Sequence, residues 1–251
     1  MLKLGLAEMR DDLVHLTLLG KACGASSLAF ESSLRLVGML TETDIAADEI
    51  SILALIQVLE EMDSAHVSVF KKGRGESVRV SDATARYGID AVRSLQRFAA
   101  DEFAFWQRCK RAAILYDWLD GTEVEEIERR YSYTPFQGNV SYGDIVRVAD
   151  ATRFHLRSAH QIFAAMYPEK PQLLASLSTL LDRLELGLPA DALPLTEVAG
   201  LSRGQYLALL QQGCRTSSDV DAIPYATLVD IIGTVGAVSI RREEEAQAGQ
   251  R

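Results

Sequence analysis

The chain has 251 residues and a formal net charge of −9; 48% of its residues are hydrophobic and 24% are charged. A chain of this length and composition can fold around a large core, as globular proteins do. The acidic balance argues against a protein that coats DNA without specificity, and the sequence has no apolar run of about 18 residues that could span a membrane. We therefore expect a cytoplasmic protein with no membrane partner.

The first half of the chain predicts helices joined by polar or glycine-rich connectors. Helical spacing of apolar residues, with serine or aspartate at helix starts and glycine at helix ends, marks the boundaries. The expected segments are an apolar stretch at 13–23, a helix from Ser26 or Ser27 to Leu40, a helix at 48–62, a connector at 70–80, and helical sequence from Ser81 or Asp82 that includes 91–98 and 101–119.

The second half continues this pattern and then changes. Thr122 with Glu125 predicts a capping box for a short helix at 123–131. After a boundary at Gly187, Pro189 and Pro194, the segments are short and are joined by minimal corners, which is typical of a helix-hairpin-helix module. The remaining expected segments are a loop at 132–142, helices at 143–166 and 172–186, one short pair at 193–199 and 203–212, another at 219–222 and 224–232, and a frayed end at 241–251.

These segments predict an all-α protein. We expect a multi-helix bundle over residues 1–188, a small helix-hairpin-helix module over 189–236, and a charged tail over 237–251. Charged groups are interpreted as solvent-exposed faces. The basic ones are Lys71, Lys72, Arg74 and Arg79, and further along Arg93, Arg97, Arg108, Lys110 and Arg111; the acidic ones lie at 123–128 and 243–245.

No motif for catalysis or metal binding is present. The sequence has no phosphate-binding loop, no Gly-x-Ser-x-Gly, no His-Glu-x-x-His and no Cys-x-x-Cys. His155 and His160 are five residues apart, so on a helix they diverge by about 140°. We expect no metal site, no catalytic site of the chain's own, and free cysteines at positions 23, 109 and 214.

The segment 143–166 has the most informative pattern. At about 100° per residue, one face is an apolar stripe, and the opposite face carries Arg147, Phe154, Ser158 and Gln161 together with Ala151. A phenylalanine in a polar face, in line with an arginine, is a combination that single-stranded nucleic acid favours, since the ring stacks a base and the guanidinium contacts a phosphate or a base edge. The alternative is that both faces are buried and Phe154 belongs to a core. The stripe consists of Ile145, Val148, Ala149, Thr152, Leu156, Ala159, Phe163 and Met166.

Four short stretches in this order resemble the C-terminal third of superkiller-type superfamily 2 DNA helicases, most closely the archaeal fork-repair helicases. They read Leu-Thr-Leu-Leu-Gly-Lys at 16–21, Tyr-Asp-Trp-Leu-Asp-Gly at 116–121, Glu-Glu-Ile-Glu-Arg-Arg-Tyr at 125–131 and Gly-Asp-Ile-Val-Arg at 143–147. In that family a ratchet helix crosses the tunnel of the translocating strand and presents an arginine and, seven residues later, a tryptophan. The resemblance implies these roles for Arg147 and Phe154, with phenylalanine replacing tryptophan.

The resemblance also implies a DNA-binding hairpin near Gly200, Ser202 and Arg203, where backbone N–H groups would hold a phosphate. Ser202 stands where the family has a second glycine, and the alternative is that the hairpin has a packing or regulatory role against the bundle. Because motor motifs are missing from this sequence, ATP and Mg²⁺ would act only through helicase motor domains in cis or trans. The expected partners are those motor domains and single-stranded or forked DNA.

Two interpretations of function remain open. In the first, the chain guides single-stranded nucleic acid for an ATP-dependent helicase, as the shared face of Arg147 and Phe154 favours. In the second, it is a helical protein-interaction or regulatory module that has lost DNA binding, as the net charge of −9 favours.

Overall fold

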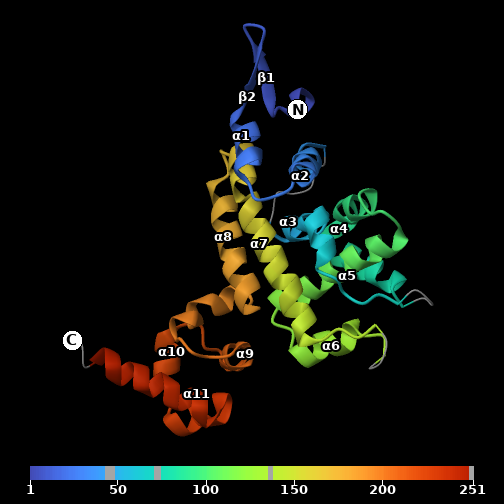
Figure 1. The fold of residues 1–251 in the computed structure, drawn as a ribbon. Coiled ribbons are helices and arrows are strands. Elements are labelled where there is room, and N and C mark those ends of the chain that lie inside the picture. The colour runs from blue at the N-terminus through green and yellow to red at the C-terminus, as the bar shows by residue number, and fades with distance from the viewer. Residues whose placement is uncertain (43–48, 71–74, 135–137, 249–251) are drawn as a thin grey trace.

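A computed structural model describes residues 1–42, 49–70, 75–134 and 138–248 of the chain. The described residues are mostly helical and include a single two-stranded sheet, so the expected multi-helix architecture is confirmed in its broad form (Figure 1). The elements are η1 (Leu2–Leu4), β1 (Ala7–Arg10), β2 (Leu13–Leu16), α1 (Leu18–Ala25), α2 (Phe30–Glu42), α3 (Glu49–Ile56), η2 (Glu60–Ser64), α4 (Ser77–Arg97), α5 (Glu102–Leu119), α6 (Val124–Tyr131), α7 (Tyr142–Met166), α8 (Pro171–Leu186), η3 (Ala190–Glu197), α9 (Arg203–Gln211), α10 (Ser217–Asp221) and α11 (Tyr225–Ala248), where η marks a 3₁₀ helix.

The β-hairpin is the largest departure from the predicted elements. Strand β1 pairs antiparallel with β2, and the turn residues Asp11 and Asp12 have φ values of +50° and +62°. Left-handed backbone at both central residues is what a tight type I′ hairpin turn requires, and aspartate tolerates it. The apolar stretch at 13–23 is therefore half strand. Its helical part, α1, starts after Thr17, whose side chain accepts a hydrogen bond from the Gly20 N–H.

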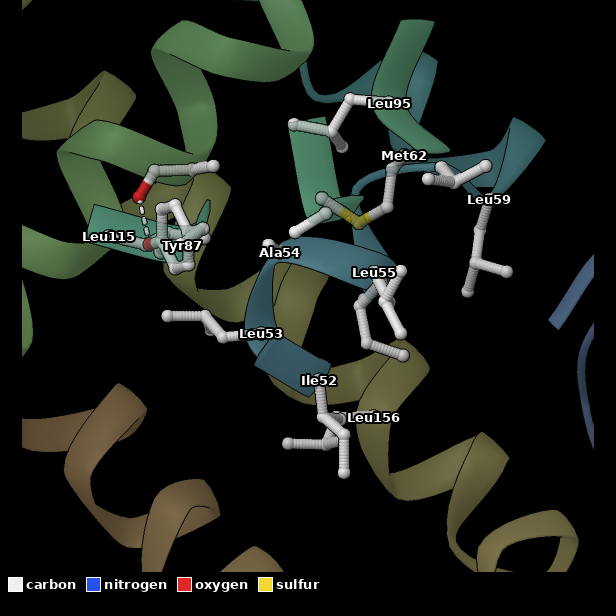
Figure 2. Close-up of a cluster of buried hydrophobic side chains, with 14 of the residues drawn as sticks. Ile52, Leu53, Ala54, Leu55, Leu59, Met62, Tyr87, Leu95, Leu115 and Leu156 are labelled. Carbon is white, nitrogen blue, oxygen red and sulfur yellow. Dashed lines mark hydrogen bonds between the residues drawn. The ribbon is translucent and has the colours of Figure 1, made fainter. Parts of the chain in front are cut away.

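A first core cluster fills the bundle between Leu6 and Leu184. Helix α3 lies deep within it, with every residue from Ile52 to Ile56 buried. Figure 2 shows how these side chains meet Leu156 of α7 and Tyr87 of α4, whose hydroxyl donates to the Ala112 carbonyl oxygen. A helix that is apolar on all sides is stable only when neighbours cover all of it, and α4, α5, α7 and α8 do so here.

Helix α5 corrects one of our interpretations. Arg108, Lys110 and Arg111, which we interpreted as a solvent-exposed face, are fully buried. The helix packs against α3, α4, α6, α7 and α8, so no side of its middle turns faces water. Carboxylates reach these cations inside the fold: the Arg108 and Arg111 guanidiniums contact Asp63 at 3.0 and 3.2 Å, and the Lys110 ammonium donates to Glu76 at 3.2 Å.

The predicted start of α6 is also wrong. Its N-cap residue is Glu123, which makes no side-chain capping bond, so Thr122 and Glu125 do not form the expected capping box. The reason lies outside the helix. The Thr122 carbonyl oxygen accepts a hydrogen bond at 2.7 Å from Arg203, a residue 81 positions away, and its N–H donates to the Asp117 carbonyl oxygen. These contacts hold Thr122 outside the capping position.

A second core cluster lies between Leu188 and Ile240 and gathers η3, α9, α10 and α11. The helix-hairpin-helix interpretation is not confirmed, since the first element of the expected pair is a 3₁₀ helix that contains Pro194. Helix α11 kinks at Gly233 (φ +78°) and continues to Ala248, through the segment that we expected to be frayed. Residues Ala237 and Ile240 are buried, so this cluster extends past position 236.

Candidate nucleic-acid interface

Helix α7 presents its predicted apolar stripe to the core. The stripe residues from Ile145 to Phe163 are buried, and Met166 is partly buried at the helix end. The helix begins with a reciprocal capping box between Ser141 and Asp144, so its start is fixed by local hydrogen bonds. With α1, α3, α5 and α8 packed along it, α7 is a rigid support for whatever its outer face carries.

Phe154 lies on that outer face and 57% of its surface is exposed. The expectation that it lies off the core stripe is confirmed, and the alternative of a second buried face does not hold at this residue. Its ring meets the His155 ring edge-on, with the centroids 5.2 Å apart. Burial lowers the pKa of His155, and the charge of Glu61 opposes this shift. Burial therefore favours the neutral form of the ring beside Phe154.

Arg147 lies two helical turns before Phe154, about 10.5 Å along the axis. Its guanidinium is half exposed but is already engaged: one nitrogen donates to the His66 carbonyl oxygen at 2.8 Å and forms an ion pair with Asp144. Burial raises the pKa of Asp144, but hydrogen bonds from Ser141 and Arg147 outweigh this effect and the net shift is downward. Arg147 thus ties the first turn of α7 to the chain before α4.

Ser158 and Gln161 continue the outer face toward the C-terminal end of α7. The Ser158 hydroxyl donates to the Phe154 carbonyl oxygen at 3.0 Å, and Gln161 is exposed. With Phe154 they line a hollow of about 250 Å³, which is completed by Arg157 and by the end of α1 at Ala25, Ser26 and Ser27. Three of the four predicted α7 residues therefore meet at one hollow, and Arg147 is not among those that line it.

Arg157 was missed by sequence reasoning. It lies three residues after Phe154 and about 60° around the helix, just outside the face that we selected. It is exposed, and among the described residues no ion pair or hydrogen bond engages its guanidinium. The signal that could have found it is this i, i+3 spacing from the aromatic ring, which places two side chains side by side on a helix.

The predicted hairpin corner near Gly200 is held by hydrogen bonds to other parts of the protein. Gly200 has φ +77°, and Ser202 caps α9 through a capping box with Gln205. Arg203 donates to the carbonyl oxygens of Gly187 at 2.7 Å and Trp118 at 3.2 Å, as well as to that of Thr122, and its guanidinium lies 4.3 Å from the Trp118 ring centroid. Burial lowers the pKa of Arg203 to about 10. Arg203 therefore joins the second cluster to the bundle, whereas its phosphate role stays a prediction.

Gly187 shows how close this junction is. It has φ +67°, and a Cβ built there would lie 2.2 Å from the Trp118 ring. Only glycine fits both the backbone and the space.

The first basic group that we interpreted as solvent-exposed lies only partly within the described residues. Lys71, Lys72 and Arg74 lie outside the described residues. Arg79 forms an ion pair with Asp82, donates to the Arg130 carbonyl oxygen and covers the Tyr131 ring at 4.8 Å. The described part of this group is therefore engaged inside the protein.

Comparison with protein-family models finds no match, and comparison with curated proteins finds no relative. In the described part of the chain, no helix combines the length and apolar character needed to cross a membrane. No group of three or more histidine, cysteine or acidic side chains comes together there in an arrangement that could hold a metal ion.

Proposed function

We propose that this chain guides single-stranded nucleic acid, and that it serves an ATP-dependent superfamily 2 helicase whose motor domains lie outside this sequence. The observation that carries the proposal is Phe154, an exposed phenylalanine on a helix that is otherwise anchored by its core stripe. The resemblance of four short stretches to the C-terminal third of such helicases supports the same assignment.

A phenylalanine left in water contributes nothing to folding, whereas stacking on one base is worth about 1–3 kcal/mol. Stacking is tolerant of sequence because every base has a flat π face. A rigid α7 pays little ordering entropy when the strand binds, since its backbone is already fixed by its neighbours. A translocating strand needs this kind of contact, which holds any base and releases it.

The test is binding of a fluorescently labelled oligothymidylate to the purified chain. Phe154→Ala should weaken binding by about 5- to 150-fold, the equivalent of 1–3 kcal/mol, and Phe154→Trp should retain it. Tyr225→Ala removes another exposed aromatic side chain, on α11, and is the matched control that should bind like the wild type. Equal affinities for wild type and Phe154→Ala would overturn the proposal.

The proposal also assigns ATP hydrolysis to the motor partner. The purified chain should show no DNA-stimulated ATPase activity, because its sequence has no nucleotide-binding motif. Hydrolysis that survives repeated purification and persists in Phe154→Ala would show that the chain has a motor of its own.

A protein-interaction module is the second candidate, and the β-hairpin favours it. The hairpin is a sheet of two strands that projects from one end of the fold (Figure 1). Four of its apolar side chains are about half exposed or more: Met9, Leu13, Val14 and Leu16. Apolar side chains gathered on an uncovered sheet are typical of contact surfaces between proteins. Under this candidate function, Val14→Lys would abolish partner binding, and the wild-type chain would not bind oligothymidylate.

A further inference from the structure

We infer that the strand runs from Phe154 along a groove between α1 and α7, and that Arg157 and Lys21 contact its phosphates in place of Arg147. This inference rests on the proposed function and specifies where the nucleotides lie. It differs from what the helicase resemblance implies, since that resemblance pairs Phe154 with Arg147.

The groove consists of two adjoining hollows. The hollow beside Phe154 has a volume of about 250 Å³, and the next one, between α1 and the last turns of α7, has about 370 Å³. Both are lined by Ala25 and Gln161, so they are continuous. Figure 1 shows α1 lying across the C-terminal part of α7, far from the end of α7 that lies near α6. Arg147 belongs to the N-terminal turns of α7, which begins at Tyr142. The continuous hollow therefore leads from Phe154 away from Arg147.

The floor of the groove suits sugars and bases. In its α1–α7 part the lining is mostly small and apolar, with alanines from both helices. Small side chains let a flat ring or a ribose come close to the helix backbones. At the Phe154 end, the exposed Ser27 hydroxyl adds a hydrogen-bonding group, whereas the Ser26 hydroxyl already donates to the Cys23 carbonyl oxygen.

Each hollow of the groove is lined by one unengaged cation. Arg157 lines the hollow beside Phe154 and Lys21 lines the hollow between α1 and α7, and both side chains are exposed. Within the described ranges neither side chain has an ion-pair partner, whereas Arg147 is tied to Asp144 and to a backbone carbonyl. A cation without a partner gains more from a phosphate than one that must first break an ion pair.

An acidic residue also favours a path of the strand along α1 over a path toward Arg147. Asp150 is exposed on the outer face of α7, three residues after Arg147 and four before Phe154. It has no cation partner among the residues that the structure describes. A phosphate that ran from Phe154 toward Arg147 would pass this carboxylate, and like charges repel at this range. The α1 side has no such barrier among the residues that line the groove.

The experiment measures binding of labelled oligothymidylate to the full chain over a series of salt concentrations. Each phosphate contact on a single strand contributes about 0.7 to the slope of log affinity against log salt. Arg157→Ala and Lys21→Ala should each weaken binding and reduce the slope by about 0.7, and the double variant by about 1.4. Arg147→Ala should leave the slope unchanged, and Ala164→Trp, which fills the groove, should weaken binding.

The outcomes separate this inference from the proposed function. If Phe154→Ala weakens binding and the slope falls in Arg147→Ala but not in Arg157→Ala, the groove is overturned and the guiding function stands. If Phe154→Ala has no effect, or if the wild type does not bind up to about 1 mM, both fail. If an amphipathic peptide binds in the groove and Ala164→Trp blocks the peptide but not the oligonucleotide, the groove is a peptide site and the inference is overturned.

Discussion

Helices α5 and α7 pack against each other, yet each places side chains in an environment opposite to the usual one for their type. The middle of α5 buries two arginines and a lysine, while α7 leaves a phenylalanine in water. The difference comes from the neighbours: α5 is surrounded on all sides by helices, whereas α7 is covered on its core stripe and only at one end of its outer face, by α1. Residue type therefore predicts the environment of a side chain less well than the number of elements around it does.

The buried cations of α5 are connected to the rest of the bundle. Arg111 donates to the Gln57 side-chain oxygen at 3.2 Å, and Gln57 donates in turn to the Thr152 hydroxyl of α7 at 3.0 Å. At the end of α5, Asp117 accepts from Arg86, Arg130 and the Tyr131 hydroxyl. These bonds compensate much of the desolvation cost and require one arrangement of helices, as a purely apolar contact would not.

The largest expected effect comes from breaking a buried pair of α5. Glu76→Gln leaves the Lys110 ammonium buried without its carboxylate, and should destabilise the fold by about 3–5 kcal/mol at pH 7 in urea unfolding. The matched control is the double variant Glu76→Leu with Lys110→Met, which removes both charges and should be close to the wild type in stability. A small loss in Glu76→Gln would mean that water reaches Lys110 and that the burial contrast with α7 is weaker than described.

The stability of the Glu76→Gln variant should also depend on pH, which tests whether the Lys110 charge is buried. Burial lowers the pKa of Lys110 from its ordinary value of 10.5, and the Glu76 charge opposes this shift, so its removal lowers that pKa further. The unfolded chain then holds the proton more tightly than the folded one, and stability rises with pH toward 10.5. Glu76→Gln should therefore recover stability between pH 7 and pH 10 relative to the wild type. A constant difference across this range would contradict the buried charge.

Arg203 lies outside α5, and it is also a cation that is held inside the protein, in its case by hydrogen bonds to carbonyl oxygens. Arg203→Ala removes hydrogen bonds to three carbonyl oxygens that join the second core cluster to the bundle, and should cost about 2–3 kcal/mol. Protease cleavage between residues 187 and 194 should become faster. Arg129→Ala, which removes an exposed ion pair, should change stability by less than about 0.5 kcal/mol. Similar losses in the two variants would remove Arg203 from the junction.

His155 should produce a smaller effect that depends on pH. Because burial lowers its pKa from 6.5, the unfolded chain binds a proton at this residue more readily than the folded chain does. The stability that neutral His155 contributes is fully present above pH 6.5 and is lost as the pH falls below it. The melting temperature of the wild type should therefore fall more between pH 7.5 and 5.5 than that of His155→Gln. Parallel curves would show that His155 does not titrate differently on folding.

The smallest expected change in stability belongs to Phe154. Phe154→Ala should alter the free energy of unfolding by less than about 0.5 kcal/mol because the ring is exposed. Leu156→Ala, two residues along the same helix but buried, should cost about 2–5 kcal/mol. Thermal and urea unfolding of these two variants compare the contributions of the outer face and the core face of α7 to stability. A core-like loss in Phe154→Ala would show that the ring is covered in solution.

Part of the candidate site could be predicted from the sequence. The limits of α5 and α7, the core stripe of α7 and the outward position of Phe154 all follow from caps and from the helical repeat. These signals are local, because a cap or a period involves residues only a few positions apart. Arg157 was missed, and the sequence does not show that Arg147 already has partners in the packed structure.

The sequence by itself determined that this chain is mostly helical and which face of α7 enters the core. The tertiary structure decided that α5 buries its cations and that Arg203 joins the second cluster to the bundle. The physical reason is distance along the chain. Asp63 lies 45 residues before Arg108, and Trp118 lies 85 residues before Arg203, so no local pattern could show these partners. Charge placement is fixed by such remote neighbours, whereas helix formation is fixed mainly by near ones.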